Sequence, residues 1–280
     1  MRILYDIGAN CGDYTLCNID KYDKVICVDA SQLQCELLEK NVPKFKCVIV
    51  HTLVSNSQNS QFYRCTAGGL SSASIEWISG KGRFAPGNKV HSEDLKWEHE
   101  KVDITSLDTL INIHGAPSFI KVDVEGHELE VIKSLTNCSC PIAFEWAEEM
   151  KEETIKTIVY LDEILGYNRF YIQYTDKYSF VPNEYCYRST NQILQIIEHQ
   201  FVPDNQDLWG MIWCKKSSLD QESTLDQKST LDQESTLDQE STLDQKSTLD
   251  QKSTLDQEST LDQESTLDQK STLDQKSSTP

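Results

Sequence analysis

The sequence predicts an α/β domain with a mostly parallel β-sheet and helices on both faces, followed by a separate repetitive tail. Short apolar runs alternate with helical patterns along the first 216 residues, an order typical of parallel sheets whose crossovers are helices. The runs are almost continuously apolar, which indicates strands buried on both faces. At Ser217 the composition changes to a hexapeptide repeat. We therefore treat residues 1–216 as the folding domain, long enough for one hydrophobic core, and residues 217–280 as a low-complexity tail.

The amino-terminal part of the domain contains three strands and two helices. Strands are expected at residues 3–7, 25–28 and 47–50, where isoleucine, leucine and valine cluster in short runs. Helices are expected after the first two runs, at residues 13–22 and 32–40. The second helix follows a serine, a preferred N-cap residue, and stops before a proline.

A long stretch at residues 55–101 interrupts this alternation. It is rich in serine, glycine and asparagine, and Trp77, Phe84 and Trp97 are dispersed through it. Because long insertions in compact domains are often lids or binding loops, residues 64–100 are our candidate for a lid over a ligand site. The alternative, a variable surface excursion, fits the composition equally well.

The alternation resumes after the insertion and continues to the end of the domain. The expected elements are a helix at 106–110, strands at 119–124 and 141–144, helices at 129–135 and 148–165, a strand at 170–174, a helix at 190–198 and a strand at 211–214. Together with the first three, this predicts about seven strands, most of them separated by helices.

The tail consists of ten hexapeptides from Ser217 to Lys276, Ser-Thr-Leu-Asp-Gln followed by Glu or Lys, the first of which has Ser218 in place of Thr. On an α-helix six residues advance about 600°, so successive leucines point about 120° apart and form no stripe for a coiled coil. One apolar residue in six buries too little surface to fold alone. We predict a disordered tail; the alternatives are a solvated helix or an array that binds a protein partner.

The net charge of −19 is shared between the two parts. Five repeats end in Glu and five in Lys, so the tail carries −10 and the domain −9. Proteins that bind nucleic acids usually present a basic surface, and this domain is acidic. We therefore expect no nucleic-acid partner.

Cysteine usage and hydropathy bear on the compartment. All ten cysteines lie in the domain, no Cys-x-x-Cys pair occurs, and the close pair Cys138 and Cys140 lacks histidines at zinc-finger spacing. Free thiols are typical of a reducing compartment. There is no basic-apolar leader and no run of eighteen apolar residues. We expect a soluble, cytoplasmic protein without a membrane partner.

A glycine-containing turn, Asp6-Ile7-Gly8-Ala9-Asn10-Cys11-Gly12, joins the first strand to the first helix. Such a turn at the carboxyl end of a strand allows the backbone to approach a ligand closely. Its spacing differs from the Gly-x-Gly-x-x-Gly of dinucleotide sites, so a nicotinamide cofactor is disfavoured. Asp29 ends the second strand, where an acidic side chain can accept hydrogen bonds from the ribose of an adenosine cofactor.

A cluster of acidic residues follows two later strands. Strand alternation places Lys121, Asp123 and Glu125 on one side, with the two acids at the edge where open α/β sheets bind ligands. His127 opens the next helix, and Glu145 ends the next strand at the same edge. The three carboxylates could offer oxygens to Mg²⁺. The simpler interpretation is that they form hydrogen bonds with ligands, and we predict no metal.

These motifs resemble those of the FkbM family of methyltransferases. The similarity rests on the Asp-x-Gly-x-Asn-x-Gly turn and on Ile-Lys-x-Asp-x-Glu-Gly-x-Glu at residues 120–128. Two further segments are similar to the family, Thr-Ser-Leu-Asp-Thr-Leu at residues 105–110 and Gly-Leu-Ser-Ser at residues 69–72. The resemblance covers roughly residues 2–214. It differs at residues 30–31, where Ala-Ser follows Asp29 and the family often has Glu-Pro.

The resemblance implies a Rossmann-like, seven-stranded class I methyltransferase that binds S-adenosylmethionine and methylates a hydroxyl of a sugar, a glycan or another small molecule. The residues expected to bind the donor are Asp6, Gly8, Asn10 and Gly12 around the methionine, Asp29 at the ribose, and Ser55 and Asn56 near the adenine. A hydroxyl acceptor needs a base, for which the candidates are Asp123 and Glu125, then His127. Glu145 is expected to bind the acceptor.

Three other functions compete with this hypothesis. A nicotinamide-dependent oxidoreductase lacks its glycine fingerprint here. A nucleic-acid methyltransferase is disfavoured by the acidic charge and by the absence of Asp-Pro-Pro-Tyr or Asn-Pro-Pro-Tyr. The third is a non-catalytic fold that binds the cofactor and displays the repeat tail to a protein partner, against which the intact turn and acidic residues argue.

Overall fold

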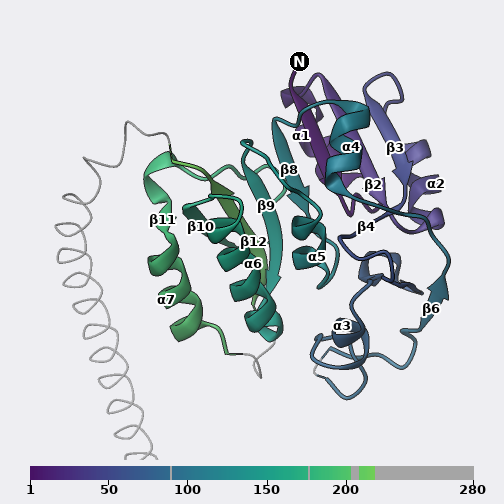
Figure 1. Ribbon diagram of the computed structural model, residues 1–280. Coiled ribbons are helices and arrows are strands. Elements are labelled where there is room, and N and C mark those ends of the chain that lie inside the picture. Colours follow the sequence, from purple (N-terminus) through teal and green to yellow (C-terminus); the bar gives the residue numbers. More distant parts are fainter. Residues whose placement is uncertain (89, 176, 203–207, 218–280) are drawn as a thin grey trace, which may run out of the picture. The chain divides into compact units, whose positions relative to one another are not determined.

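The computed structural model describes residues 1–88, 90–175, 177–202 and 208–217 (Figure 1). Residues 1–217 form one compact unit. The prediction of a disordered tail concerns residues outside the described ranges. In the part that is described, no helix combines the length and apolar character needed to cross a membrane.

An eight-stranded, mostly parallel sheet forms the centre of the domain, in the order β11-β10-β12-β9-β8-β1-β2-β3. The strands are β1 (Ile3–Ile7), β2 (Lys24–Asp29), β3 (Cys47–His51), β8 (Phe119–Val122), β9 (Ile142–Ala147), β10 (Arg169–Tyr174), β11 (Arg188–Ser189) and β12 (Trp209–Lys215). Strands are present at all seven predicted positions, and β11 is the additional one. Neighbours from β3 to β9 pair in parallel, whereas β12 is antiparallel to both β9 and β10.

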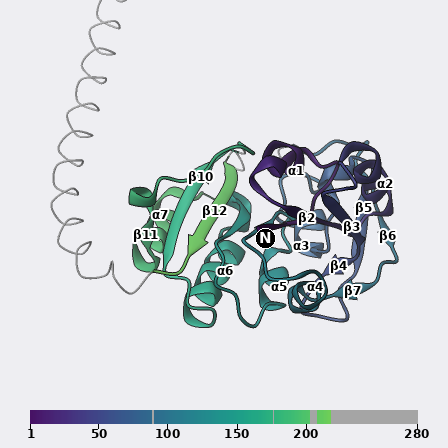
Figure 2. The ribbon, with the colours of Figure 1, turned by 90° about the horizontal axis from the view of Figure 1, so that it is seen from above.

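Helices cover both faces of the sheet, as predicted (Figure 2). They are α1 (Asp13–Asn18), α2 (Gln32–Asn41), α4 (Leu107–His114), α5 (Glu128–Lys133), α6 (Lys151–Glu163) and α7 (Thr190–Gln200). The predicted helix at 13–22 is shorter, because the chain changes to a 3₁₀ turn, Ile19–Lys21, after Asn18. Successive side chains of β1 point to opposite faces of the sheet. Tyr5 packs in the hydrophobic cluster that includes residues of α4 to α7, and Leu4 packs in a second cluster with Leu38 of α2.

The insertion between β3 and α4 folds into small elements of its own. Within it, β5 (Phe62–Cys65) pairs antiparallel with β6 (Trp97–Glu100), and β4 (Leu53–Val54) pairs in parallel with β7 (Ile104–Thr105). The 3₁₀ turn Gly68–Leu70 and helix α3 (Ile75–Ser79) lie between β5 and β6. Trp77 of α3 is 3% exposed and packs with Ala147, the last residue of β9, and with Met150 beyond that strand. The insertion is therefore anchored by an apolar cluster at the carboxyl edge of the sheet, below the strands in Figure 1.

The strand order places a crevice next to β1. The chain runs outward from β1 through β2 to β3, and then returns to the other side of β1 as β8. Connections that leave neighbouring strands in opposite directions open a crevice at their carboxyl ends, which is where open α/β sheets bind ligands. The loops after β1, β2 and β8 all meet there.

Candidate active site

The turn after β1 brings its backbone against the loop after β8. Gly8 has a φ of +74°, and a Cβ at this position would lie 1.8 Å from the carbonyl oxygen of Asp123. Both the left-handed conformation and the close approach therefore require glycine. The Gly8 and Ala9 amides donate to the carbonyl of Val28, which fixes the turn to the end of β2.

A buried ion-pair network lies beneath this turn. Asp6 is fully buried, and its carboxylate accepts a hydrogen bond of 2.6 Å from Thr15 Oγ1 of α1. Lys121 Nζ lies 3.2 Å from Asp6 and 3.3 Å from Asp123, and donates to the Gly8 carbonyl at 2.8 Å. Burial disfavours the charge of Lys121, but Asp123 and Asp6 outweigh it and raise the pKa of the ammonium. Lys121 thus connects the two loops that carry the motifs.

Asp29 is oriented by backbone amides at the end of β2. Its carboxylate accepts hydrogen bonds of 2.9 Å from the amides of Asn10 and Ser31. Burial raises the pKa of Asp29 to about 6, and the two amide donors act in the opposite direction. Asn10 itself adopts a φ of 47°, so the turn directs its amide toward Asp29.

A cavity of about 250 Å³ occupies the crevice. Its polar wall includes four carboxylates, those of Asp29, Asp123, Glu125 and Glu145, and no described lysine or arginine lines it. The remaining lining is mainly small and apolar, from the turn after β1, from the strand β4 and from the insertion. The cavity therefore combines acidic groups with small and apolar surfaces.

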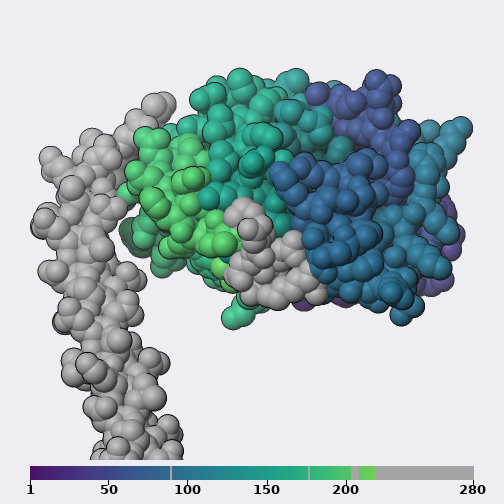
Figure 3. Space-filling model, turned by 90° about the horizontal axis from the view of Figure 1, so that it is seen from below, coloured from purple at the N-terminus to yellow at the C-terminus, as the bar shows by residue number. Residues whose placement is uncertain are grey.

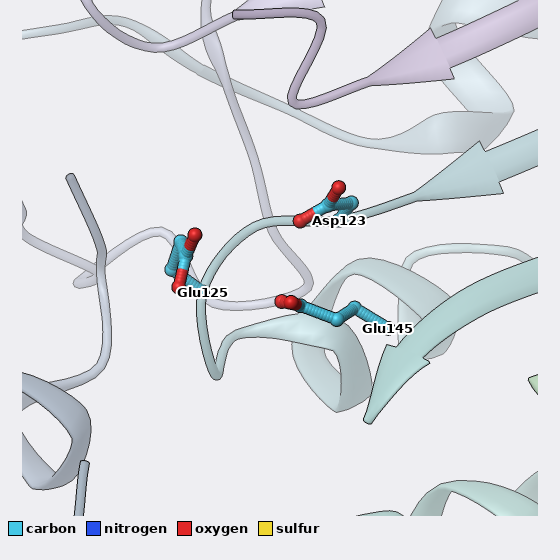
Figure 4. A group of neighbouring side chains, drawn as sticks. All are labelled: Asp123, Glu125 and Glu145. Atoms are coloured by element: carbon cyan, nitrogen blue, oxygen red, sulfur yellow. The ribbon is translucent and has the colours of Figure 1, made fainter. Parts of the chain in front are cut away.

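Three of these carboxylates converge (Figure 4). Glu145 extends from β9 toward the loop that carries Asp123 and Glu125, and oxygens of the three groups lie within 4.8 Å of one another. Burial, followed by the charges of Asp123 and Glu128, raises the pKa of Glu125 well above its usual value. Burial, followed by Asp123, does the same to the pKa of Glu145. Glu125 and Glu145 therefore keep their protons to a higher pH than exposed glutamates do, and a cation beside them would favour their ionised forms.

The family model described as methyltransferase FkbM domain matches residues 6–206. The chain belongs to the FkbM methyltransferase family. A solved structure, the methyltransferase domain of a bacterial CtHen1, is 12% identical, covers 76% of this chain and 90% of its own, and superposes with a TM-score of 0.35. No curated protein matches the chain.

Seven of the predicted site residues of this FkbM-family domain line the cavity. They are Gly8, Asn10, Asp29, Asp123, Glu125, His127 and Glu145. His127 is the N-cap residue of α5, and its Nε2 lies 3.2 Å from Ser55 Oγ. Burial lowers the pKa of His127 to about 4, so the imidazole is neutral near pH 7.

The other four predicted residues lie outside the lining. Asp6 points into the ion-pair network below the turn. Gly12 is the N-cap residue of α1, where a Cβ would meet the side chain of Val42 at 2.8 Å. Ser55 is buried and bonds to His127 and Ser60, and Asn56 is exposed. Their roles as direct ligands of a cofactor do not follow from this geometry.

The sequence did not indicate several residues that the structure brings to the cavity. After β3 the chain continues into β4, which pairs with β7, so that Thr52, Leu53 and Val54 line the cavity in place of Ser55 and Asn56. Trp209 arrives from β12, more than sixty residues after Glu145. The position of Thr52, Leu53 and Val54 after a buried strand was a sequence signal for these three residues. No sequence pattern indicated Trp209.

The three carboxylates could also act as ligands of a metal ion. Their spacing could hold one. However, Asp123 already faces the Lys121 ammonium at 3.3 Å, which supplies the positive charge that an ion would bring. The expectation that the three carboxylates bind organic ligands and no metal stays a prediction.

Proposed function

We propose that this protein transfers a methyl group from S-adenosylmethionine to a hydroxyl of a sugar or another small molecule. The observation that carries the proposal is the acidic cavity at the carboxyl edge of the sheet, where Asp29 and the Asp123–Glu125–Glu145 cluster face one space. Membership of the FkbM family supports methyl transfer. The choice of donor and of the acceptor atom is our inference.

The charge of the cavity fits this donor. S-adenosylmethionine carries positive charge on its sulfur and its amine, and carboxylates stabilise both. A dinucleotide would bring a pyrophosphate, for which the described lining offers no lysine or arginine. Gly8 allows the turn after β1 to pack against the backbone of Asp123, and Asp29 is positioned to accept hydrogen bonds from a ribose.

The chain's own residues would then position the acceptor and accept its proton. The donor supplies an activated methyl group on a sulfonium, so the protein's first task is to align the two reactants at roughly 3–3.5 Å. Glu145 would hold the acceptor by a hydrogen bond. Glu125 or Asp123 would take the proton of the attacking hydroxyl, since both belong to the cluster and line the cavity.

The first test is calorimetric titration of the full chain with S-adenosylhomocysteine. We expect saturable binding, weakened about 10- to 100-fold in Asp29→Ala, because hydrogen bonds to a charged group contribute about 1.5–3 kcal/mol. Asp20→Ala, which removes an exposed aspartate outside the cavity, is the matched control and should bind like the wild type. Absence of binding by the folded chain would refute the proposal. Binding without turnover of any acceptor would favour the non-catalytic alternative.

The protein should also release more protons when it binds the methyl donor than when it binds S-adenosylhomocysteine. Glu125 and Glu145 have raised pKa values, and a positive sulfur favours their ionised forms. Calorimetry in phosphate and Tris at one pH measures the protons released, and we expect a difference of up to about one proton between the two ligands. Glu145→Gln should reduce this difference. Equal proton release by both ligands would show that the cluster does not face the sulfur.

A further inference from the structure

A second cavity, of about 440 Å³, adjoins the first on the side of the insertion. Glu125, Glu145 and Trp209 line both cavities, so the two spaces meet at the carboxylate cluster. The insertion contributes Trp77 and Phe84 to the outer walls. In Figure 3, which views the molecule from below, the insertion, in blue, forms a lobe beside the teal and green parts of the domain. A molecule in this second cavity would reach a donor only at the cluster.

The walls of the second cavity favour a flat, apolar body. Trp77 and Phe84 meet edge to face with ring centroids 6.4 Å apart, and Trp209 adds a third aromatic ring. The other apolar side chains are Leu70, Val90 and Ala147. Aromatic walls of this kind bind planar rings by stacking and by burial of apolar area.

The charges that face this cavity are unfavourable to anions. The carboxylates of Glu125 and Glu145 line its inner end. Arg83 is the one lysine or arginine among the described lining residues, and its guanidinium is already engaged. Its Nε and Nη2 donate to the two oxygens of Glu149 at 2.7 and 2.8 Å, and Nη2 also donates to the carbonyl of Leu208 at 2.8 Å. A ligand carboxylate or phosphate would find like charge and no unpaired cation.

The same arginine fixes the shape of the cavity. Arg83 and Glu149 are both buried, and the backbone amide of Arg83 adds a third hydrogen bond to the Glu149 carboxylate. The guanidinium lies 5.0 Å from the ring centroid of Trp209. This buried, bidentate ion pair holds the insertion against the segment after β9, and the hydrogen bond to Leu208 holds it against the start of β12. The aromatic walls are thus preformed.

We propose that the second cavity holds the methyl acceptor, and that it takes a flat ring that carries the hydroxyl and no negatively charged group. The inference rests on the proposed function, since it places the hydroxyl at the cluster and the donor beyond it. It narrows the acceptor class from sugars and small molecules in general to uncharged planar rings. Trp209 and Phe84 become determinants of specificity.

The test compares two ligands of equal shape and different charge. Full-length protein with saturating S-adenosylhomocysteine is titrated by calorimetry with 4-ethylphenol, and separately with 4-hydroxyphenylacetate, in which a carboxylate replaces the methyl group. We expect saturable binding of 4-ethylphenol and binding at least about tenfold weaker for the anion. Equal or tighter binding of the anion, or no binding of either ring, overturns the inference.

Variants of the cavity walls show where the ring binds. Trp209→Ala and Phe84→Leu should each weaken 4-ethylphenol at least about fivefold. Because Phe84 lines the second cavity and not the first, Phe84→Leu should leave S-adenosylhomocysteine binding within about twofold. Phe84→Leu keeps an apolar side chain, so it provides the comparison if Trp209→Ala folds poorly. Tyr185→Ala removes an aromatic ring that is 83% exposed and lines neither cavity, and should change nothing. Unchanged ring binding in both wall variants refutes the location. Failure of S-adenosylhomocysteine to bind refutes the proposed function instead.

Discussion

Replacing Lys121 by methionine is expected to lower the free energy of unfolding by about 3–5 kcal/mol, because it leaves buried carboxylate charge unpaired. The side chain of Lys121 is 5% exposed, and its ammonium lies within 3.3 Å of both Asp6 and Asp123. In the variant, the hydroxyl of Thr15 is the side-chain hydrogen-bond donor that Asp6 keeps among the described residues. Urea unfolding of the wild type and the variant, with the midpoint and slope fitted together, measures the loss.

Lys133→Met is the matched control for this prediction. Lys133 also pairs with a carboxylate, that of Glu130 at 2.9 Å, but both side chains are about one-third exposed. The loss there should stay below about 1 kcal/mol. The double variant Asp6→Asn/Lys121→Met should lose less free energy of unfolding than the sum of the losses in the two single variants, because both members of the ion pair are removed together. A loss for Lys121→Met no larger than for Lys133→Met would show that the network does not stabilise the fold.

The sequence was sufficient to predict the sheet because its strands are continuous apolar runs. Seven runs gave seven strands, including β12, whose antiparallel direction no apolar run could indicate. The strand β11 was missed because it contains only Arg188 and Ser189 and buries little. The first helix ends earlier than expected because helical propensity alone does not specify where an α-helix changes to a 3₁₀ turn.

The site was predictable where strands end and unpredictable where distant segments meet. Gly8, Asp29 and Asp123 follow strands of a parallel sheet, so topology alone brings them to one edge. Side-chain alternation along β1 directs Asp6 to the face of the sheet that α1 covers. Asp6 therefore stabilises the turn through Thr15 and does not line the cavity. The ion pair of Arg83 and Glu149 joins residues 66 apart in sequence, and no local pattern encodes such a contact.

Glu125→Gln is expected to lower kcat by about 10²- to 10⁴-fold, the usual contribution of a positioned base, while S-adenosylhomocysteine binds almost unchanged. Glutamine preserves the shape of the side chain but cannot accept the acceptor's proton. Formation of S-adenosylhomocysteine from the methyl donor is measured with 4-ethylphenol and with methyl β-glucoside, using whichever is turned over. Glu145→Gln is the comparison: it should mainly raise the KM of the acceptor, because Glu145 holds the acceptor in our proposal. Equal kcat for the wild type and Glu125→Gln would remove Glu125 as the base and leave Asp123.

The pH dependence of the wild type separates this base from His127. A carboxyl accepts a proton only when ionised, so kcat/KM for the methyl donor, which reports the free protein, should rise with pH through the raised pKa of the cluster, above the ordinary pKa of a glutamate. If His127 were the base, the rise would lie near pH 4, because burial lowers its pKa to about 4. In Glu125→Gln, the residual activity should no longer rise with pH above the ordinary pKa of a glutamate. In His127→Asn, that rise should remain. A rise near pH 4 that disappears in His127→Asn would transfer the role of base to the imidazole.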